Sequence, residues 1–164
     1  AGYSIEVGPV EPIHSQVVGR AGLKFNGNLI VDGSLDININ DEGDKLECLN
    51  APEGIKILAS SSNFMDSKFS LVIPAGTAVP SKLIVGNKGP LTKMTFAISE
   101  ETGLYTPDRG ADKCDIALDR KENTDILNLK IVCLMDELKL DTGAKLELKA
   151  SIQCNLTGSQ LAPE

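Results

Sequence analysis

Hydrophobic and polar residues alternate with a period of two along much of the chain. The clearest run is residues 145–154, whose apolar positions are Leu146, Leu148, Ala150, Ile152 and Cys154. Residues 34–40 and 126–133 alternate in the same way. Because successive side chains of a strand point to opposite faces, each run predicts a strand with one buried and one solvated face.

The same pattern predicts short strands throughout the sequence, over residues 3–7, 22–25, 28–31, 34–40, 46–49, 55–58, 68–73, 82–85, 92–98, 114–118, 126–134, 137–141 and 145–154. No segment of helical length keeps an apolar stripe, and the best helical candidate is one turn from Asp119 to Thr124. We therefore expect an all-β fold with little or no helix, an antiparallel, immunoglobulin-like β-sandwich formed by residues 1–164 as one domain. A β-barrel is the alternative.

Turn-forming residues separate the predicted strands. Asn26-Gly27 and Asp32-Gly33 are hairpin dipeptides, and Asp141-Thr142-Gly143 lies between two further alternating runs. Additional loops are predicted at Pro74–Gly76, Gly86–Pro90 and Pro107–Gly110. The glycine spacing in residues 22–39 also resembles a hexapeptide β-helix, but it stops after a few rungs, so successive hairpins are preferred.

The four cysteines, Cys48, Cys114, Cys133 and Cys154, lack the close spacing of zinc ligands. An even number of widely scattered cysteines favours two disulfides and therefore an oxidising compartment. The first residues, Ala1-Gly2, fit a mature product after removal of a signal peptide. We expect a secreted, periplasmic or cell-surface protein. Four reduced, buried thiols in a cytosolic protein are the alternative.

One disulfide pairing follows from the predicted terminal hairpin. Residues 137–141 would pair with residues 145–154 across the turn at Asp141–Gly143, with a β-bulge at Met135-Asp136 to correct the change in apolar parity. Cys133 would then lie opposite or diagonal to Cys154, leaving Cys48 to pair with Cys114. Four cysteines allow three connectivities, and the other two stay open.

Charge and composition exclude several classes of protein. The 164 residues include 16 Lys and Arg against 23 Asp and Glu, so the formal net charge is −7. This balance argues against binding to nucleic acid or to an anionic membrane, which need clustered cations. No apolar run reaches the roughly 20 residues that span a bilayer. A single histidine excludes a histidine-rich metal site.

Candidates for catalysis are weak. The only imidazole, His14, lies in a loop-like stretch, and the sequence contains no G-x-S-x-G nucleophile motif. The acidic pairs Glu100-Glu101 and Asp136-Glu137 would point to opposite faces of a strand, unlike the two carboxylates of a glycosidase. The scarcity of aromatic residues also weakens a sugar-stacking platform. We expect no enzyme activity, no cofactor and no resident metal.

Two further motifs are ambiguous. Asp36 to Asp44 spell D-I-N-I-N-D-E-G-D, whose alternating oxygen ligands are similar to a calcium loop. The glycine and the closing glutamate of such a loop are missing at the required positions, so a polar strand face followed by an acidic turn explains the segment better. Asn155-Leu156-Thr157 is a glycosylation sequon, which matters only in a eukaryotic source.

The N-terminal residues 1–20 form either a first strand with a linker or an arm. Tyr3–Val7 alternates and is followed by Gly8-Pro9 and Pro12. Such a segment could add to the sheet edge of another subunit, because backbone pairing and alternate apolar pockets make strand addition strong.

Residues Gly22-Leu23-Lys24-Phe25-Asn26-Gly27-Asn28-Leu29 fit the phrase G-x-L/V-x-F-x-G-x-I/L. In this, and in its alternating N-terminal extension, the chain resembles subunits of bacterial fimbriae assembled by the chaperone–usher route. The resemblance covers about 30 residues. It implies a polymer of immunoglobulin-like subunits joined by strand addition, with a role in surface attachment.

Together these features predict a non-enzymatic exported surface protein, a structural or adhesive subunit of a fimbria-like assembly. Its partners would be other protein subunits or a host or surface receptor, with no nucleic acid and no membrane span. The alternatives are a secreted β-barrel or β-sandwich that binds a small ligand or carbohydrate, an enzyme relying on carboxylates or His14, and a pore-forming toxin or inhibitor.

Overall fold

The computed structural model describes residues 17–27, 32–77, 81–84, 93–99, 104–107, 114–137 and 145–157, and within these ranges it contains strands and turns but no helix. The all-β expectation is confirmed. The strands are β2 (Gly19–Gly27), β3 (Gly33–Asn38), β4 (Asp44–Ala51), β5 (Gly54–Ser61), β6 (Ser67–Pro74), β7 (Ser81–Ile84), β8 (Lys93–Ala97), β9 (Tyr105–Pro107), β10 (Cys114–Arg120), β11 (Ile126–Glu137) and β12 (Lys145–Thr157).

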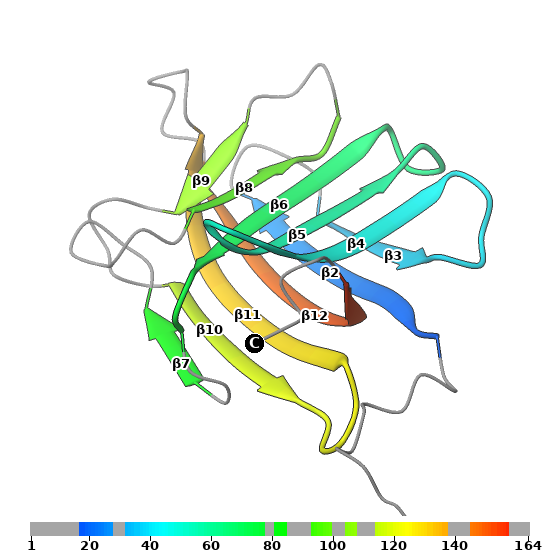
Figure 1. Ribbon diagram of the computed structural model, residues 1–164. Helices are drawn as coiled ribbons and strands as arrows, with labels where there is room; N and C mark the ends of the chain where they lie inside the picture. Colours follow the sequence, from blue (N-terminus) through cyan, green and yellow to red (C-terminus); the bar gives the residue numbers. More distant parts are fainter. Residues whose placement is uncertain are drawn as a thin grey trace, which may run out of the picture.

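The eleven strands form one mixed sheet in the order β3-β2-β12-β4-β5-β6-β8-β9-β11-β10-β7. All pairings are antiparallel except that of β12 with β4, which is parallel. β11 also pairs with β12. The strands β12, β4, β5, β6, β8, β9 and β11 therefore form a partial ring, in this order. In Figure 1, β4, β5, β6 and β8 lie above, and β2, β12, β11 and β10 curve side by side below.

The alternation seen in the sequence sets which face of each strand is buried. Along β12 the even-numbered residues from Leu146 to Leu156 are buried, and the residues between them are exposed or half-buried. Buried residues of the other strands join them in a single hydrophobic cluster. A fully buried Leu, Ile or Phe side chain stabilises the fold by about 1.5–3 kcal/mol. This one-sided pattern therefore determines which face of each strand is buried and which face contacts solvent.

Most predicted strands in the described ranges are present, and several are longer than predicted. β9 was not predicted. The hairpin dipeptide expected at Asn26-Gly27 is wrong, because both residues pair with β12 inside a strand. The expected helical turn from Asp119 to Thr124 is also wrong, because Asn123 has a φ of 60° and the chain reverses there between β10 and β11. Residues 3–7 and 28–31 lie outside the described ranges.

The predicted bulge at Met135-Asp136 is wrong, and so is the disulfide pairing that depended on it. β11 pairs with β12 in one unbroken register that includes Met135 opposite Leu146 and Asp136 opposite Lys145. The apolar parity of β11 continues to Met135, which is fully buried, so no extra residue is needed. The predicted turn at Asp141–Gly143 lies outside the described residues.

This register places Cys133 and Cys154 far apart along the β11–β12 pair, with Cys133 opposite Leu148 and Cys154 opposite Leu127. The disulfides instead join Cys114 to Cys133 and Cys48 to Cys154. Cys114 and Cys133 lie directly opposite each other on the neighbouring strands β10 and β11.

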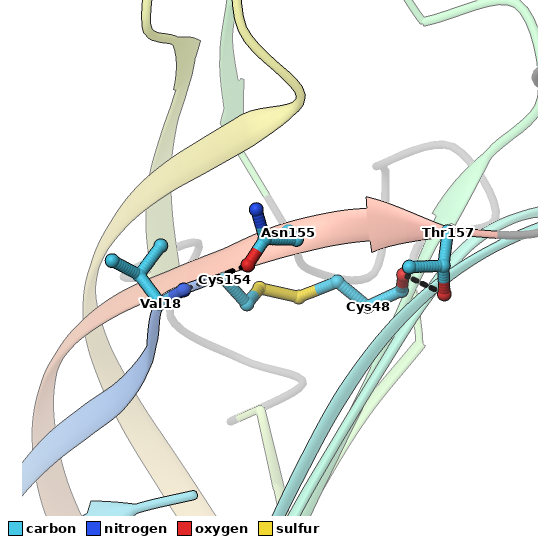
Figure 2. Close-up of a disulfide and its surroundings, with 5 residues drawn as sticks. All are labelled: Val18, Cys48, Cys154, Asn155 and Thr157. Atoms are coloured by element: carbon cyan, nitrogen blue, oxygen red, sulfur yellow. Dashed lines mark hydrogen bonds between the residues drawn. A yellow bond between two sulfur atoms is a disulfide. The ribbon is translucent and has the colours of Figure 1, made fainter. Parts of the chain in front are cut away.

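The Cys48–Cys154 disulfide links β4 to β12 beside their short parallel pairing, in which Leu156 lies opposite Cys48. Figure 2 shows this bond bridging the two strands, with the Thr157 hydroxyl donating a hydrogen bond to the Cys48 carbonyl. The two disulfides indicate an oxidising, extracytoplasmic environment. Within the described ranges, no helix is long and apolar enough to cross a membrane.

Candidate functional site

A hollow lies on the outer face of β3, β2, β12 and β11, opposite the face that enters the core. Its two halves are lined by overlapping sets of residues that share Gly22, Asp36, Lys130 and Ser151. One half alone has a volume of about 570 Å³. We call the whole hollow the outer trough.

The strand register explains why the surface is hollow at this point. Asp36, Gly22, Ser151 and Lys130 are aligned across the four strands, each opposite the next. The two central positions carry the smallest side chains of the row, and larger side chains stand on either side along the strands. A Cβ at Gly22 would meet the Asp36 carboxylate at 3.5 Å, an ordinary contact, so the backbone does not require glycine here. The effect of Gly22 is to leave space above the sheet.

Positive charge gathers around the outer trough. The cations among its lining residues are Arg20, Lys24, Lys130 and Lys149, and all four are exposed. Asp36 is the single acidic residue among the described lining residues. No ion pair joins the four cations to another side chain of the described ranges. The described lining residues therefore carry a local excess of three positive charges in a chain whose net charge is −7.

Two of these lysines form an unfavourable pair. Lys24 on β2 and Lys149 on β12 lie directly opposite each other on the same face of the sheet. Like charges at directly opposite positions destabilise a sheet. Natural proteins break such local rules mainly at functional positions, so the pair points to a role in binding.

Neutral polar side chains border the end of the outer trough that lies away from Lys24 and Lys149. The Gln153 amide nitrogen donates a hydrogen bond of 3.0 Å to the Asn128 side-chain oxygen across β12 and β11. Asn38 on β3 presents a further amide, whose oxygen accepts a hydrogen bond from the Asn40 N–H. The cross-strand bond fixes Gln153 and Asn128 and leaves each with further hydrogen-bonding capacity.

The acidic segment from Asp36 to Asp44 is divided between two environments. Asp36 lines the outer trough, whereas the Asp44 carboxylate accepts hydrogen bonds from the Ser61 hydroxyl, the Asn63 amide and the Asn38 N–H. Desolvation raises the pKa of Asp44, but these hydrogen bonds outweigh it and hold that pKa below the ordinary value. No group of three His, Cys, Asp or Glu in the described ranges is arranged to hold a metal ion.

The sequon residue Asn155 has a structural role at the end of β12. Its side-chain oxygen accepts a hydrogen bond of 2.8 Å from the Val18 N–H (Figure 2), and its nitrogen donates one of 3.0 Å to Asp125. The Leu156 N–H donates to the Asp125 carbonyl beside it. This amide therefore joins the entry to β2 with the entry to β11.

Among the catalytic candidates, the structure describes the side chain of Asp136 alone. His14 and Glu100-Glu101 lie outside the described ranges. Asp136 forms an ion pair with Lys145, its opposite residue in the β11–β12 register, and the side chain of Glu137 is not described. The expectations of no catalytic site and no cofactor stay predictions.

Comparison of the chain with protein-family models, with curated proteins and with solved structures finds no match. The resemblance to chaperone–usher fimbrial subunits therefore stays a prediction based on the sequence pattern.

Proposed function

We propose that the protein is a non-enzymatic, exported surface protein that acts as a structural or adhesive subunit of a fimbria-like assembly. The observation that carries the proposal is the outer trough, an exposed polar and cationic face built on four strands, of which β11 and β12 each carry a disulfide. Sites on strands hold their side chains in fixed positions, which suits recognition of an external surface. Location on the cell surface, rather than free secretion or a periplasmic location, belongs to the same proposal.

A two-layer, immunoglobulin-like sandwich is the proposed architecture. It is supported by the curvature of the sheet, which places β4, β5, β6 and β8 on one side and β2, β12, β11 and β10 on the other (Figure 1), with buried residues of both sides in one hydrophobic cluster. The Cys48–Cys154 disulfide would then tie one layer to the other.

Assembly with other subunits is supported by the edge strand β3. It has β2 as its single sheet partner, and among the described residues no strand pairs with its other edge. An open edge of this kind is the receiving element for strand addition. The part of the proposed arm, residues 1–20, that precedes β2 would supply the added strand, since Gly19 and Arg20 already pair within the sheet.

The experiment combines two measurements on the purified, oxidised chain. Light scattering after size-exclusion chromatography should show oligomers that grow with protein concentration, and labelled protein should attach to cells or to extracellular matrix. A strict monomer at all concentrations that attaches to neither would overturn the proposal.

A secreted carbohydrate-binding protein is the second candidate, and the hydrogen-bonding groups of the outer trough favour it. This candidate predicts a monomer that binds a soluble glycan. The light-scattering measurement therefore separates it from the assembled subunit.

A further inference from the structure

We propose that the outer trough binds a linear acidic polysaccharide, a chain of sugars that carry carboxylate groups. Arg20, Lys24, Lys130 and Lys149 would contact the carboxylates, and the neutral polar groups would bind sugar hydroxyls. The inference rests on the proposed function, because it names the chemistry of the surface to which such a subunit attaches.

Charge complementarity identifies an anionic occupant. Four exposed cations face one carboxylate in the trough, while the chain as a whole is acidic. Lys24 and Lys149 lie opposite each other, and Lys130 occupies the next strand one row away, so three ammonium groups surround one end of the floor. A row of carboxylates would reduce the repulsion among these lysines, none of which forms an ion pair with a described side chain.

The remaining polar groups favour sugar over nucleic acid. The Asp36 carboxylate accepts hydrogen bonds from hydroxyl groups, and the side chains of Gln153, Asn128 and Ser151 both donate and accept. Among the described residues lining the trough there is no aromatic ring. Bases of single-stranded nucleic acid bind largely by stacking on such rings, so the trough lacks the main element of a single-stranded nucleic-acid site. It also lacks a stacking platform for sugar rings, so binding of a polysaccharide would depend on charge and hydrogen bonds.

The shape favours a polymer over an enclosed small molecule. The trough extends over three rows of outward side chains and four strands, an area of about 14 Å by 14 Å from standard strand spacings. It is a shallow hollow in a sheet face, and its floor at Gly22 and Ser151 lies between the amide end and the lysine end. An extended chain can lie across this floor and continue past both ends.

The test measures binding of the full-length oxidised chain to polygalacturonate at low ionic strength. We expect binding that weakens as salt is added and that neutral dextran does not reproduce. The double variant Lys24→Gln with Lys149→Gln should weaken binding by about tenfold or more, the factor expected for losing a charge-assisted hydrogen bond.

The matched control is the double variant Lys45→Gln with Lys68→Gln. It removes the same charge from exposed lysines of β4 and β6, away from the trough. It should bind polygalacturonate within about twofold of the unsubstituted protein, because surface lysines outside a site contribute little. The trough variant should also unfold at the same or a higher temperature, since it removes a like-charged pair. A loss of binding with retained folding is thus attributable to the trough.

Four results would overturn the inference: no binding of polygalacturonate, equal binding of dextran, an equal loss in the control variant, or tighter binding of single-stranded DNA than of polygalacturonate. If the protein attaches to cells but not to polygalacturonate, the inference fails and the proposed function stands. If it binds polygalacturonate but stays monomeric and attaches to no surface, the proposed function fails instead.

Discussion

At the scale of single residues, Asp44 shows how one carboxylate holds two turns together. It follows the turn between β3 and β4, and it binds Ser61 and Asn63 at the end of β5. Ser61 is almost completely buried, so its hydroxyl depends on this partner. The Asn63 amide also donates to the Glu42 carbonyl, which adds a second link between the turns.

Replacement of Asp44 by Asn should change how stability depends on pH. An unfolded aspartate has a pKa of about 3.9, and hydrogen bonds hold the folded pKa of Asp44 lower, so its ionisation stabilises the fold above that ordinary value. The contribution is lost as the pH falls through the folded pKa. Urea unfolding between pH 7 and pH 2.5 should show a smaller acid loss in Asp44→Asn than in the original protein.

Asp115→Asn serves as the control, because Asp115 is exposed on β10. It should keep the original pH profile. Identical acid slopes for Asp44→Asn and the original protein would contradict this role for Asp44.

The acidic segment is recognisable in the sequence, but its role in joining two turns is not. The spacing of its oxygen atoms suggested either calcium or a solvated strand face. Ser61 and Asn63 come from a hairpin about 20 residues later, and the pairing of β4 with β5 brings them to Asp44. The spacing of residues within the acidic segment therefore gives no information about Ser61 and Asn63 as hydrogen-bond partners.

At the scale of elements, the two disulfides constrain very different lengths of chain. Cys48 and Cys154 are separated by 106 residues, whereas Cys114 and Cys133 are separated by 19. In the chain-entropy model, a crosslink restricts the unfolded state more when its loop is longer. The long-range bond also supports the parallel pairing of β12 with β4, which involves only Leu156 and Thr157 of β12.

Removing the long-range disulfide should therefore destabilise the protein more. Cys48→Ser with Cys154→Ser should lower the free energy of unfolding by about 5 kcal/mol, and Cys114→Ser with Cys133→Ser by about 3 kcal/mol. Urea denaturation of both variants measures the difference. The reverse order of stability would show that loop length does not determine the effect in this fold.

Strand positions were largely predictable, but strand partners were not. Alternation identified β12 and β11 because each buries one face along its whole length. β9 has only three residues and includes Pro107, so it carries no periodic signal. The register that a turn at Asp141–Gly143 predicts for β11 and β12 differs from the observed one. In the structure the buried face of β11 continues without the bulge on which that hairpin depended.

At the scale of the whole molecule, the pairing of strands from both ends of the chain creates the outer trough. Arg20 and Lys24 come from β2, Lys130 from β11 and Lys149 from β12. The net charge of −7 argued against clustered cations, and that argument fails locally because register places these four residues together. Net charge describes the molecule's mean field, whereas a binding face depends on which residues become neighbours.

The partial ring should be weakest at β9. This strand pairs with β8 through one residue pair and with β11 through three, whereas β11 and β12 share eleven. Native-state hydrogen exchange should show the slowest amides in β11 and β12 and markedly faster ones in β9, because local opening there breaks few bonds. Equal protection of β9 and β12 would contradict this order.

The position of Asn155 makes the choice of production host a structural variable. A eukaryotic secretory pathway attaches oligosaccharide to the side-chain nitrogen of a sequon asparagine, and here that nitrogen holds Asp125 while the same amide anchors Val18. Sugar added during synthesis would reach the chain before its last strand has docked. Material from such a host would then carry a bulky group at the junction that joins the entries to β2 and β11, so a bacterial oxidising compartment is the better source of protein for the experiments above.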